Sequence, residues 1–375
     1  QIDLLSLDST TCVLTQLGST SGLPAGQYQQ IRLILLSNFP GKGEATPSSN
    51  QCGNSGYNCV VPAGGAAEAL NLSSEAQTGM KIPSGQIAGG KFTVPAGSSV
   101  DLNIDFDACS SIVRQGNGQY RLKPVLHAGE VSLNNTSISG RVIDSGTGRA
   151  IAGAIVLVEE RDSTDPNIDI DRILLQKTTG QDGRFIFCPL PGGTGTFDIV
   201  VAATNSSKTY NATVTLSVPP GTNMGDIPLV PETGGTPPAQ IKGLITSAPK
   251  PVDISLSALQ LVPVVGAKPL IVTIPLFAGS TPIVTTETGG DYTLYVPASN
   301  PQWGRFSVTP STSYTAPSSG GVYYWVNAQA FVPGSGSTAD CTPSSLPQIF
   351  DSSTRKEIIG GSITQNFTFS GCDGL

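Results

Sequence analysis

Hydrophobic and polar residues alternate along several short stretches of the chain, the pattern of strands with one buried face. The clearest stretch is residues 100–107, VDLNIDFD, in which apolar residues share one side and Asp and Asn the other. Residues 28–36 and 120–127 follow the same pattern, and helical periodicity is nearly absent. The sequence therefore predicts an all-β protein.

One local pattern occurs twice. Residues 178–185 read TTGQDGRF and residues 285–292 read TTETGGDY, each with a glycine five residues after its first threonine and an aromatic residue two positions later. Each copy also has an upstream Ile-x-Gly and a downstream glycine with an alternating segment, at residues 138–140 and 241–243 and at residues 221–229 and 361–369. The repetition predicts one small β-domain used twice, as in a modular rod or array.

The length and composition predict three such domains. The chain has 375 residues, of which only 13% are charged, with 44 glycines and 29 prolines that favour short strands and tight turns. We expect tandem β-sandwiches, Ig-like or transthyretin-like, in series over residues 1–133, 136–232 and 240–375. The segment PETGGTPPA at residues 231–239 is predicted to be a linker, and the third domain an enlarged second copy.

Charge and motif content exclude several functions. The net charge is −7 and no basic run occurs, so nucleic acid is excluded as a partner. No apolar stretch approaches the ~20 residues that span a membrane. One histidine, His127, and no Gly-x-Ser-x-Gly motif give a Ser-His-Asp hydrolase almost no support, and we expect no enzyme and no cofactor other than calcium. The start at Gln1 is expected to follow removed or unrecorded residues.

Seven cysteines and a single histidine favour disulfides over a zinc site, and so an extracellular location. Cys52 with Cys59, Cys341 with Cys372, and Cys12 with Cys109 are the predicted pairs. The odd residue, Cys188, is predicted to be a free buried thiol or, alternatively, an intermolecular bridge.

Motifs in the first third resemble a known family. These are LPAGQYQQIRLIL at residues 23–35, TGMKIPSG at 78–85, and DFDACSSIV running into YRLKPVLHAGEV at 105–131. Together they resemble the bacterial secreted proteins of domain of unknown function 4382. The resemblance implies a secreted or surface-attached β-domain, commonly behind a lipoprotein signal, with no known activity. Members of that family usually carry further strands before the segment that matches QIDLLSL, where this sequence starts. We expect either that these leading strands are missing from the recorded sequence or that they are supplied otherwise.

The middle domain resembles a second family. SISGRVIDSGTGRAIAGAIVLVEE at residues 137–160 and the repeat at 178–185 are similar to carboxypeptidase regulatory-like domains, which implies a seven-strand transthyretin-like sandwich. Related collagen-adhesin B-type domains can carry a Lys-Asn isopeptide bond whose lysine lies in the first strand. Here that strand holds Arg141 and no lysine, so the crosslink is not expected.

Calcium is one candidate ligand. Alternate oxygen-bearing residues suit a hard cation, although the EF-hand glycine and glutamate are replaced by Ile170 and Gln176. The other interpretation is the wet face of a loop or edge strand. The four candidate ligands are Asp165, Asn167, Asp169 and Asp171.

Glycans are a second candidate ligand. Flat rings on a β-face can stack on sugars, and Trp303, Tyr323 and Trp325 are the candidates, with ordinary core as the alternative. Asn-x-Ser/Thr sequences mark candidate surface glycosylation sites. These acceptors are Asn71, Asn134, Asn135, Asn205, Asn211 and Asn366.

Two functions follow from these features. The first is a non-enzymatic extracellular structural protein that polymerises into a surface filament or coat, with strand donation at an N-terminal domain that lacks its leading strands. The alternative is a cell-surface adhesin or a module that binds a polysaccharide.

Overall fold

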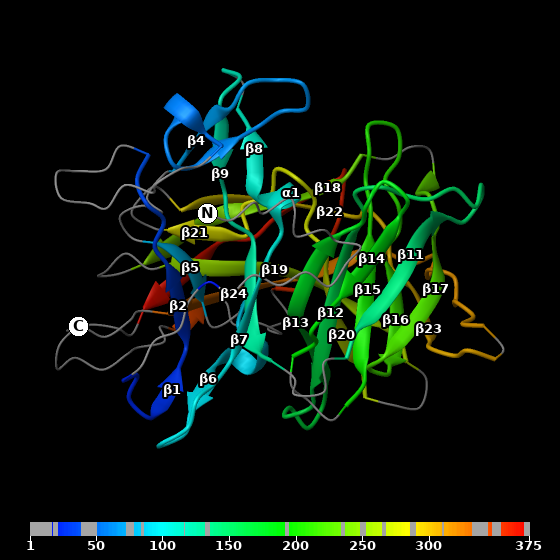
Figure 1. Ribbon diagram of the computed structural model, residues 1–375. Helices are drawn as coiled ribbons and strands as arrows, with labels where there is room; N and C mark the ends of the chain where they lie inside the picture. The colour runs from blue at the N-terminus through cyan, green and yellow to red at the C-terminus, as the bar shows by residue number, and fades with distance from the viewer. Residues whose placement is uncertain are drawn as a thin grey trace.

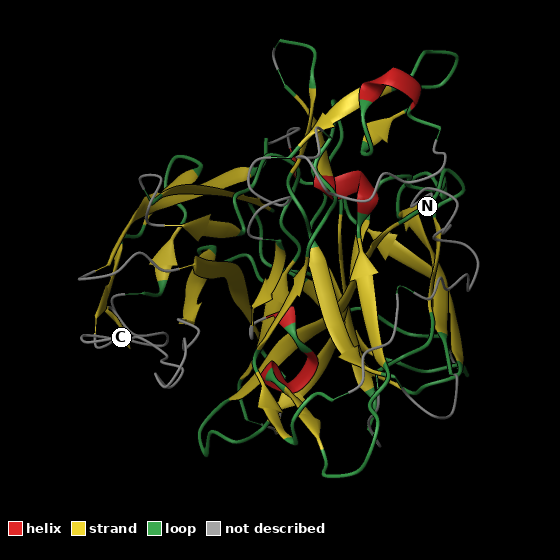
Figure 2. Cartoon of the chain, turned by 60° about the vertical axis from the view of Figure 1, so that its left-hand side comes forward, coloured by secondary structure: helices red, strands yellow, loops and turns green. Residues whose placement is uncertain are grey.

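The computed structural model describes residue 17 and residues 22–38, 51–72, 79–83, 86–115, 117–131, 136–191, 195–233, 237–247, 253–264, 268–285, 290–309, 311–331, 344–346 and 354–370. Strands make up nearly all of its regular structure, which confirms the predicted all-β class (Figure 2). The one α-helix in the described residues is a single turn, α1 (Ala108–Ser111). No helix among them is long and apolar enough to cross a membrane.

The N-terminal third consists of short strands in several small sheets (Figure 1). Its strands are β1 (Gly26–Tyr28), β2 (Gln30–Leu33), β3 (Cys59–Val60), β4 (Glu68–Asn71), β5 (Met80–Pro83), β6 (Phe92–Val94), β7 (Leu102–Phe106), β8 (Ile112–Arg114), β9 (Tyr120–Leu122) and β10 (Leu126–Glu130). β1 pairs with β6, β2 with β5, and β7 with β10, and β3, β4, β9 and β8 form a fourth sheet. Ile82, Leu126 and Ala128 lie at the centre of a core of its own.

The middle part is a sandwich of seven strands. They are β11 (Ile138–Asp144), β12 (Ile155–Asp162), β13 (Asp169–Thr178), β14 (Arg184–Phe187), β15 (Phe197–Ala202), β16 (Thr213–Val218) and β17 (Thr222–Leu229). β14, β11 and β17 form one sheet, and β16, β15, β12 and β13 form the other. Phe185, Phe187 and Ile199 belong to the core between the two sheets.

The C-terminal part is a second, larger sandwich. Its strands are β18 (Ala239–Ser247), β19 (Asp253–Val262), β20 (Leu270–Ile274), β21 (Ile283–Thr285), β22 (Asp291–Val296), β23 (Gln302–Arg305), β24 (Tyr323–Phe331), β25 (Ser344–Leu346), β26 (Lys356–Glu357), β27 (Ser362–Thr364) and β28 (Phe367–Ser370). One sheet holds β22, β18, β27, β28 and β25; β20, β19, β21, β24 and β26 belong to the other.

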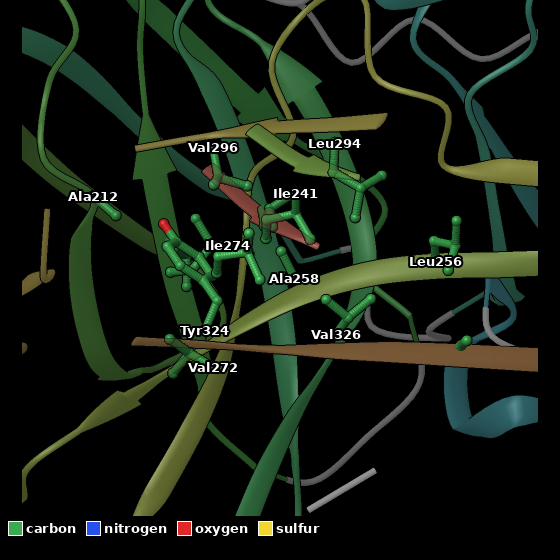
Figure 3. Packing of buried hydrophobic residues seen from close by; sticks show 14 of the residues in the cluster. Ala212, Ile241, Leu256, Ala258, Val272, Ile274, Leu294, Val296, Tyr324 and Val326 are labelled. Atoms are coloured by element: carbon green, nitrogen blue, oxygen red, sulfur yellow. The ribbon is translucent and has the colours of Figure 1, made fainter. Parts of the chain in front are cut away.

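The middle and C-terminal sandwiches share one ten-stranded sheet. Its order is β23-β16-β15-β12-β13-β20-β19-β24-β26, with β21 paired beside β19. The middle strands β12, β15 and β16 are buried on both faces because a smaller sheet packs on each side of them. On one side Ala212, from the middle part, lies in the same core as Ile241 and Tyr324 (Figure 3).

The repeat seen in the sequence corresponds to repeated topology. β11 pairs antiparallel with β14 and parallel with β17, and β18 pairs antiparallel with β22 and parallel with β27 and β28. In each copy the repeated glycine, Gly183 or Gly290, has a positive φ (+75° and +71°). Its carbonyl accepts the backbone N–H of Val142 (2.8 Å) or Ile245 (2.9 Å). The motif thus fixes the turn against the first strand, a position that only glycine occupies without strain.

Candidate functional site

The C-terminal part is joined to the middle sandwich at both edges of one sheet. At one edge β20 pairs in parallel with β13 through two residue pairs, the first being Asp169 and Leu270. At the other edge β23 pairs in parallel with β16 over four pairs that begin at Thr213 and Gln302. The four strands between these edges are therefore enclosed by strands of the following sandwich. The candidate site is the β13–β20 edge, where buried charges gather.

Beyond the last backbone pair of β13 and β20, the two sandwiches are connected by side-chain hydrogen bonds. We call Glu159, Arg161, Asp171, Asp198 and Thr273 the fork cluster. Thr273 donates its backbone N–H to Oε2 of Glu159 (3.2 Å) and its hydroxyl to the backbone carbonyl of Asp171 (3.0 Å). Both bonds run between the two sandwiches, so the cluster continues the connection that the strands begin.

Strand register places the charges of the fork cluster together. Glu159 lies opposite Asp198 in the β12–β15 ladder, and Arg161 lies opposite Asp171 in the β12–β13 ladder. The Arg161 guanidinium contacts the Asp198 carboxylate and lies 3.5 Å from Asp171. The other Asp198 oxygen accepts the backbone N–H of Ser217 (2.6 Å). Asp171 and Asp198 thus share one guanidinium, beside the buried carboxyl of Glu159.

Carboxyl groups outnumber cations in the fork cluster, and this shifts the pKa values of Glu159 and Asp171. Glu159 is 0% exposed and Asp171 1%. Burial, and then the nearby Asp171 carboxyl, raises the pKa of Glu159 well above its usual range; burial, and then Asp198, raises that of Asp171. Oε1 of Glu159 and both carboxyl oxygens of Asp171 have no hydrogen-bond partner among the described residues. The ionised forms of Glu159 and Asp171 are therefore disfavoured in the folded chain, so we expect the stability of this junction to depend on pH.

The predicted linker contributes a second polar junction. Glu232 is buried, and its backbone N–H donates to the carbonyl of Thr209 (2.8 Å). Its Oε1 accepts the backbone N–H of Ala298 (2.7 Å) and the hydroxyl of Ser299 (2.8 Å). Burial raises the pKa of this carboxyl. The start of the predicted linker, residues 231–239, is therefore packed between the two sandwiches.

The N-terminal third docks on the middle sandwich through acidic side chains. Asp107 Oδ2 accepts the hydroxyl of Thr178 (2.8 Å) and the side-chain amide of Gln176 (3.3 Å), and Asp105 accepts the backbone N–H of Gln176 (3.1 Å). His127 lies opposite Asp105 in the β10–β7 ladder. Burial raises the pKa of Asp105 to about 6 and lowers that of His127 to about 4. Asp105 is thus part of an interdomain contact, and His127 lies beside it in the sheet.

The structure does not assemble the predicted calcium site. Asp165 caps its own turn by accepting the backbone N–H of Asn167 (2.7 Å), and Asp169 lies 3.6 Å from Nζ of Lys268. Asp171 belongs to the fork cluster, so the four predicted ligands serve different contacts. No group of three or more His, Cys, Asp and Glu residues in the described part of the chain could hold a metal ion. The calcium prediction is therefore wrong for this set of residues.

The three aromatic residues predicted to bind a glycan do not form one surface. Trp303 lies in β23 at one edge of the ten-stranded sheet, whereas Tyr323 and Trp325 lie in β24 near the other. Trp325 is only 9% exposed and packs in a small apolar cluster, with the guanidinium of Arg355 5.0 Å from its ring centre. Arg355 also covers Tyr323, at 4.7 Å. Trp325 thus occupies the core position that was the alternative interpretation, whereas glycan contact by Trp303 and Tyr323 stays a prediction.

The cysteines agree in part with the predicted pairing. Cys52 and Cys59 form the predicted disulfide. Cys188 is also disulfide-bonded, so the prediction of a free or intermolecular thiol is wrong. The other pairings stay predictions because the side chains concerned, Cys12, Cys109, Cys341 and Cys372, lie outside the described residues.

The glycosylation acceptors differ in accessibility. Asn71, Asn205 and Asn366 are exposed. Asn211 is buried, and its side-chain oxygen accepts the hydroxyl of Ser299 (2.8 Å), so this acceptor is a wrong prediction for the folded chain. The remaining acceptors, Asn134 and Asn135, lie outside the described residues.

A surface cavity of about 430 Å³ lies where β17 meets the segment after β23. Its walls include Asn223, Met224 and Asp226 from β17 and Phe306 and Tyr314 from the other side. Phe306 and Tyr314 belong to the aromatic-rich C-terminal part, but the sequence gives no sign that they would meet β17. The cavity is therefore a feature of the junction between the two sandwiches.

Sequence comparison agrees with the predicted resemblance of the N-terminal third. The model of the family described as domain of unknown function (DUF4382) matches residues 1–124. No curated protein matches the chain. The resemblance of residues 136–232 to carboxypeptidase regulatory-like domains stays a prediction.

Among solved structures, similarities are distant. A streptococcal ancillary pilin is 10% identical with a TM-score of 0.21, covering 70% of this chain and 75% of that one. The shaft pilin SpaA from Lactobacillus rhamnosus GG is 12% identical with a TM-score of 0.19, covering 64% and 98%. A putative carbohydrate binding protein from Bacteroides uniformis is 13% identical with a TM-score of 0.19, covering 60% and 99%. At these TM-scores the likeness carries no argument about this chain.

Proposed function

We propose that this chain is a non-enzymatic structural protein outside the cell, where it assembles with copies of itself into a surface filament or coat. The observation that carries the proposal is the ten-stranded sheet shared by the middle and C-terminal sandwiches. A filament subunit that transmits mechanical force needs rigid connections between its domains. A continuous sheet with buried side-chain bonds across the junction meets that need better than a flexible linker does.

Other contacts support the same proposal. Asp107 binds Thr178 across the junction between the N-terminal third and the middle sandwich, so this junction too has specific side-chain bonds. Disulfides involve Cys52, Cys59 and Cys188. Disulfides persist mainly in oxidising compartments, which supports a location outside the cytoplasm.

The contact between copies is proposed to involve β2. Among the described strands, β2 pairs only with β5, so its other edge has no described strand beside it. Two exposed apolar residues follow it, Ile34 at 70% and Leu36 at 45%. An unpaired edge with apolar side chains can receive a strand from a neighbouring molecule. Strand donation at this edge would join one copy to the next.

Electron microscopy of the natively purified protein tests this proposal. We expect filaments or sheets with an axial repeat of one subunit. In the double variant Ile34→Lys and Leu36→Lys, charge beside the edge should disfavour pairing and leave dispersed monomers. Ile359→Lys is the matched control, because this residue is 75% exposed but lies in the C-terminal part. Monomers alone for the unchanged protein, at every concentration, would contradict self-assembly; filaments that persist in the double variant would contradict the role of β2.

A further inference from the structure

The sequence leaves glycan binding open as an alternative function, and the cavity beside β17 gives it a location. One wall is an irregular edge strand: the β11–β17 register shifts between Ser139 and Arg141, and Gly225 has a φ of +69°. Such bulges are frequent next to binding sites because they re-aim side chains. Here the bulge lies beside Asn223, Met224 and Asp226, all of which line the cavity.

The opposite wall is fixed by hydrogen bonds. The backbone N–H of Phe306 donates to the carbonyl of Leu216 (2.8 Å), and the hydroxyls of Tyr314 and Thr215 lie 2.9 Å apart. The backbone N–H of Ser307 donates to the hydroxyl of Thr312 (3.1 Å) within the same segment. This wall is therefore pre-formed, as is usual for small-molecule sites of about 300–1,000 Å³.

The charged groups around the cavity favour an uncharged ligand over a charged one. Its one charged lining residue among those described is Asp226. Both oxygens of that carboxylate accept hydrogen bonds from the Arg141 guanidinium, at 2.7 Å each. The charge is thus already compensated, and the described lining residues include no cationic side chain that could receive an anion. A charged ligand would lose hydration without gaining a counter-charge.

The remaining lining offers both polar and apolar contacts. Asn223 uses its side-chain oxygen to accept the N–H of Gly225 (3.0 Å), which leaves its amide group as a donor. Ser311 contributes a hydroxyl, while Met224 and the 78% exposed Val308 contribute apolar surface. A purely apolar ligand would leave the amide and hydroxyl groups unpaired, which is unfavourable. An uncharged sugar has C–H faces and hydroxyls that match both kinds of contact.

We propose that this cavity binds an uncharged sugar residue of a glycan, with its C–H face on Met224 and Val308 and its hydroxyls on Asn223 and Ser311. The site lies on a different part of the molecule from β2. Binding and self-assembly can therefore be measured independently, and failure of one does not imply failure of the other.

Saturation-transfer NMR on dispersed full-length protein tests this, with the methyl glycosides of glucose, galactose and mannose and with N-acetylglucosamine as probes. We expect at least one probe to bind at millimolar concentration. Asn223→Ala should weaken binding roughly tenfold through loss of the amide donor. Val308→Trp should abolish binding by filling the cavity, and Ser311→Trp is a second blocking variant at an exposed position. Ile359→Trp, at a similarly exposed site elsewhere, should leave binding unchanged.

Three results would overturn the proposal. If none of the four neutral probes binds, an uncharged sugar is not the ligand of this cavity. Binding that survives both tryptophan variants would place the ligand elsewhere. Glucuronic acid that binds more tightly than methyl glucoside would contradict the argument from the compensated charge of Asp226.

Discussion

The Glu159 carboxyl accepts a hydrogen bond from the backbone N–H of Thr273, 114 positions further along the chain, at 3.2 Å. Glu159 belongs to the middle sandwich and Thr273 to the C-terminal one, so this contact crosses the junction at the point where the strands stop pairing. Through this bond a buried acid of the middle sandwich contacts the C-terminal sandwich. Its protonation should therefore affect the stability of both.

Glu159→Gln should alter how stability depends on pH. Because burial raises the pKa of Glu159 above its ordinary 4.5, its contribution is fully present below about pH 4.5 and is lost as pH rises through the folded-state pKa. Asp171 adds a contribution of the same sign, which the variant retains. The variant should therefore lose less stability than the unchanged protein as the pH rises above about 4.5, measured as melting temperature. The exposed Glu68→Gln is the control and should follow the unchanged protein. Parallel pH curves for Glu159→Gln and the unchanged protein would contradict the assignment.

Arg161→Met should destabilise the fork cluster. The guanidinium is the positive charge that Asp171 and Asp198 share, and its removal leaves buried carboxylates uncompensated. Removing one partner of a buried ion pair lowers the unfolding free energy by on the order of 3 kcal/mol. Chemical denaturation at neutral pH measures the effect. Arg184→Met, at an exposed ion pair with Asp182, should change stability by less than about 1 kcal/mol. Equal effects for the two variants would show that burial does not matter here.

Gly290→Ala should cost more stability than Gly361→Ala. Both glycines have positive φ, +71° and +79°, so each substitution should introduce about 1–2 kcal/mol of backbone strain. At Gly290 an added Cβ would also collide with the backbone carbonyl of Ile245, whereas at Gly361 nothing lies within 4 Å. The difference in unfolding free energy between the variants measures the collision alone. A difference near zero would mean that the turn containing Gly290 shifts enough to relieve the collision.

Thr178→Val should loosen the N-terminal third from the middle sandwich. It removes a hydroxyl that donates to Asp107 at 2.8 Å and leaves a buried carboxyl with fewer donors, at a cost of about 1–3 kcal/mol. Hydrogen exchange of β7 and β10 should accelerate, while exchange in β19 and β24 should not change. The exposed Thr309→Val is a control and should leave all four strands unchanged. Unchanged exchange in β7 for Thr178→Val would show that the bond is dispensable.

The all-β class and the repeated domain could be predicted from sequence because both depend on local patterns. Alternation identified the strands, and Gly183 and Gly290 marked the two turns because each needs a positive φ at the same point of the repeat. The shared sheet could not be predicted in the same way, since pairing between Asp169 and Leu270 depends on contacts a hundred residues apart. One signal was nonetheless present. Residues 155–158 and 199–202 are continuously apolar rather than alternating, which is typical of strands covered on both faces.

The fork cluster was harder to predict than the sheet. Glu159 and Asp171 resemble ordinary polar positions in the sequence, and the alternation of Asp169 and Asp171 suggested a calcium ligand set instead. Only the ladder register brings Asp171 opposite Arg161, and only the shared sheet places Asp171 beside Thr273. Spacing within one segment cannot reveal partners that come from three strands.

We expect the middle and C-terminal sandwiches to form one mechanical unit. Single-molecule force spectroscopy of the full chain, pulled from its two ends, measures whether they do. We predict that residues 136–370 unfold in one step, releasing a contour length of roughly 3.3–3.6 Å per residue over the whole span. Two separate steps, one for residues 136–232 and one for the rest, would contradict the claim.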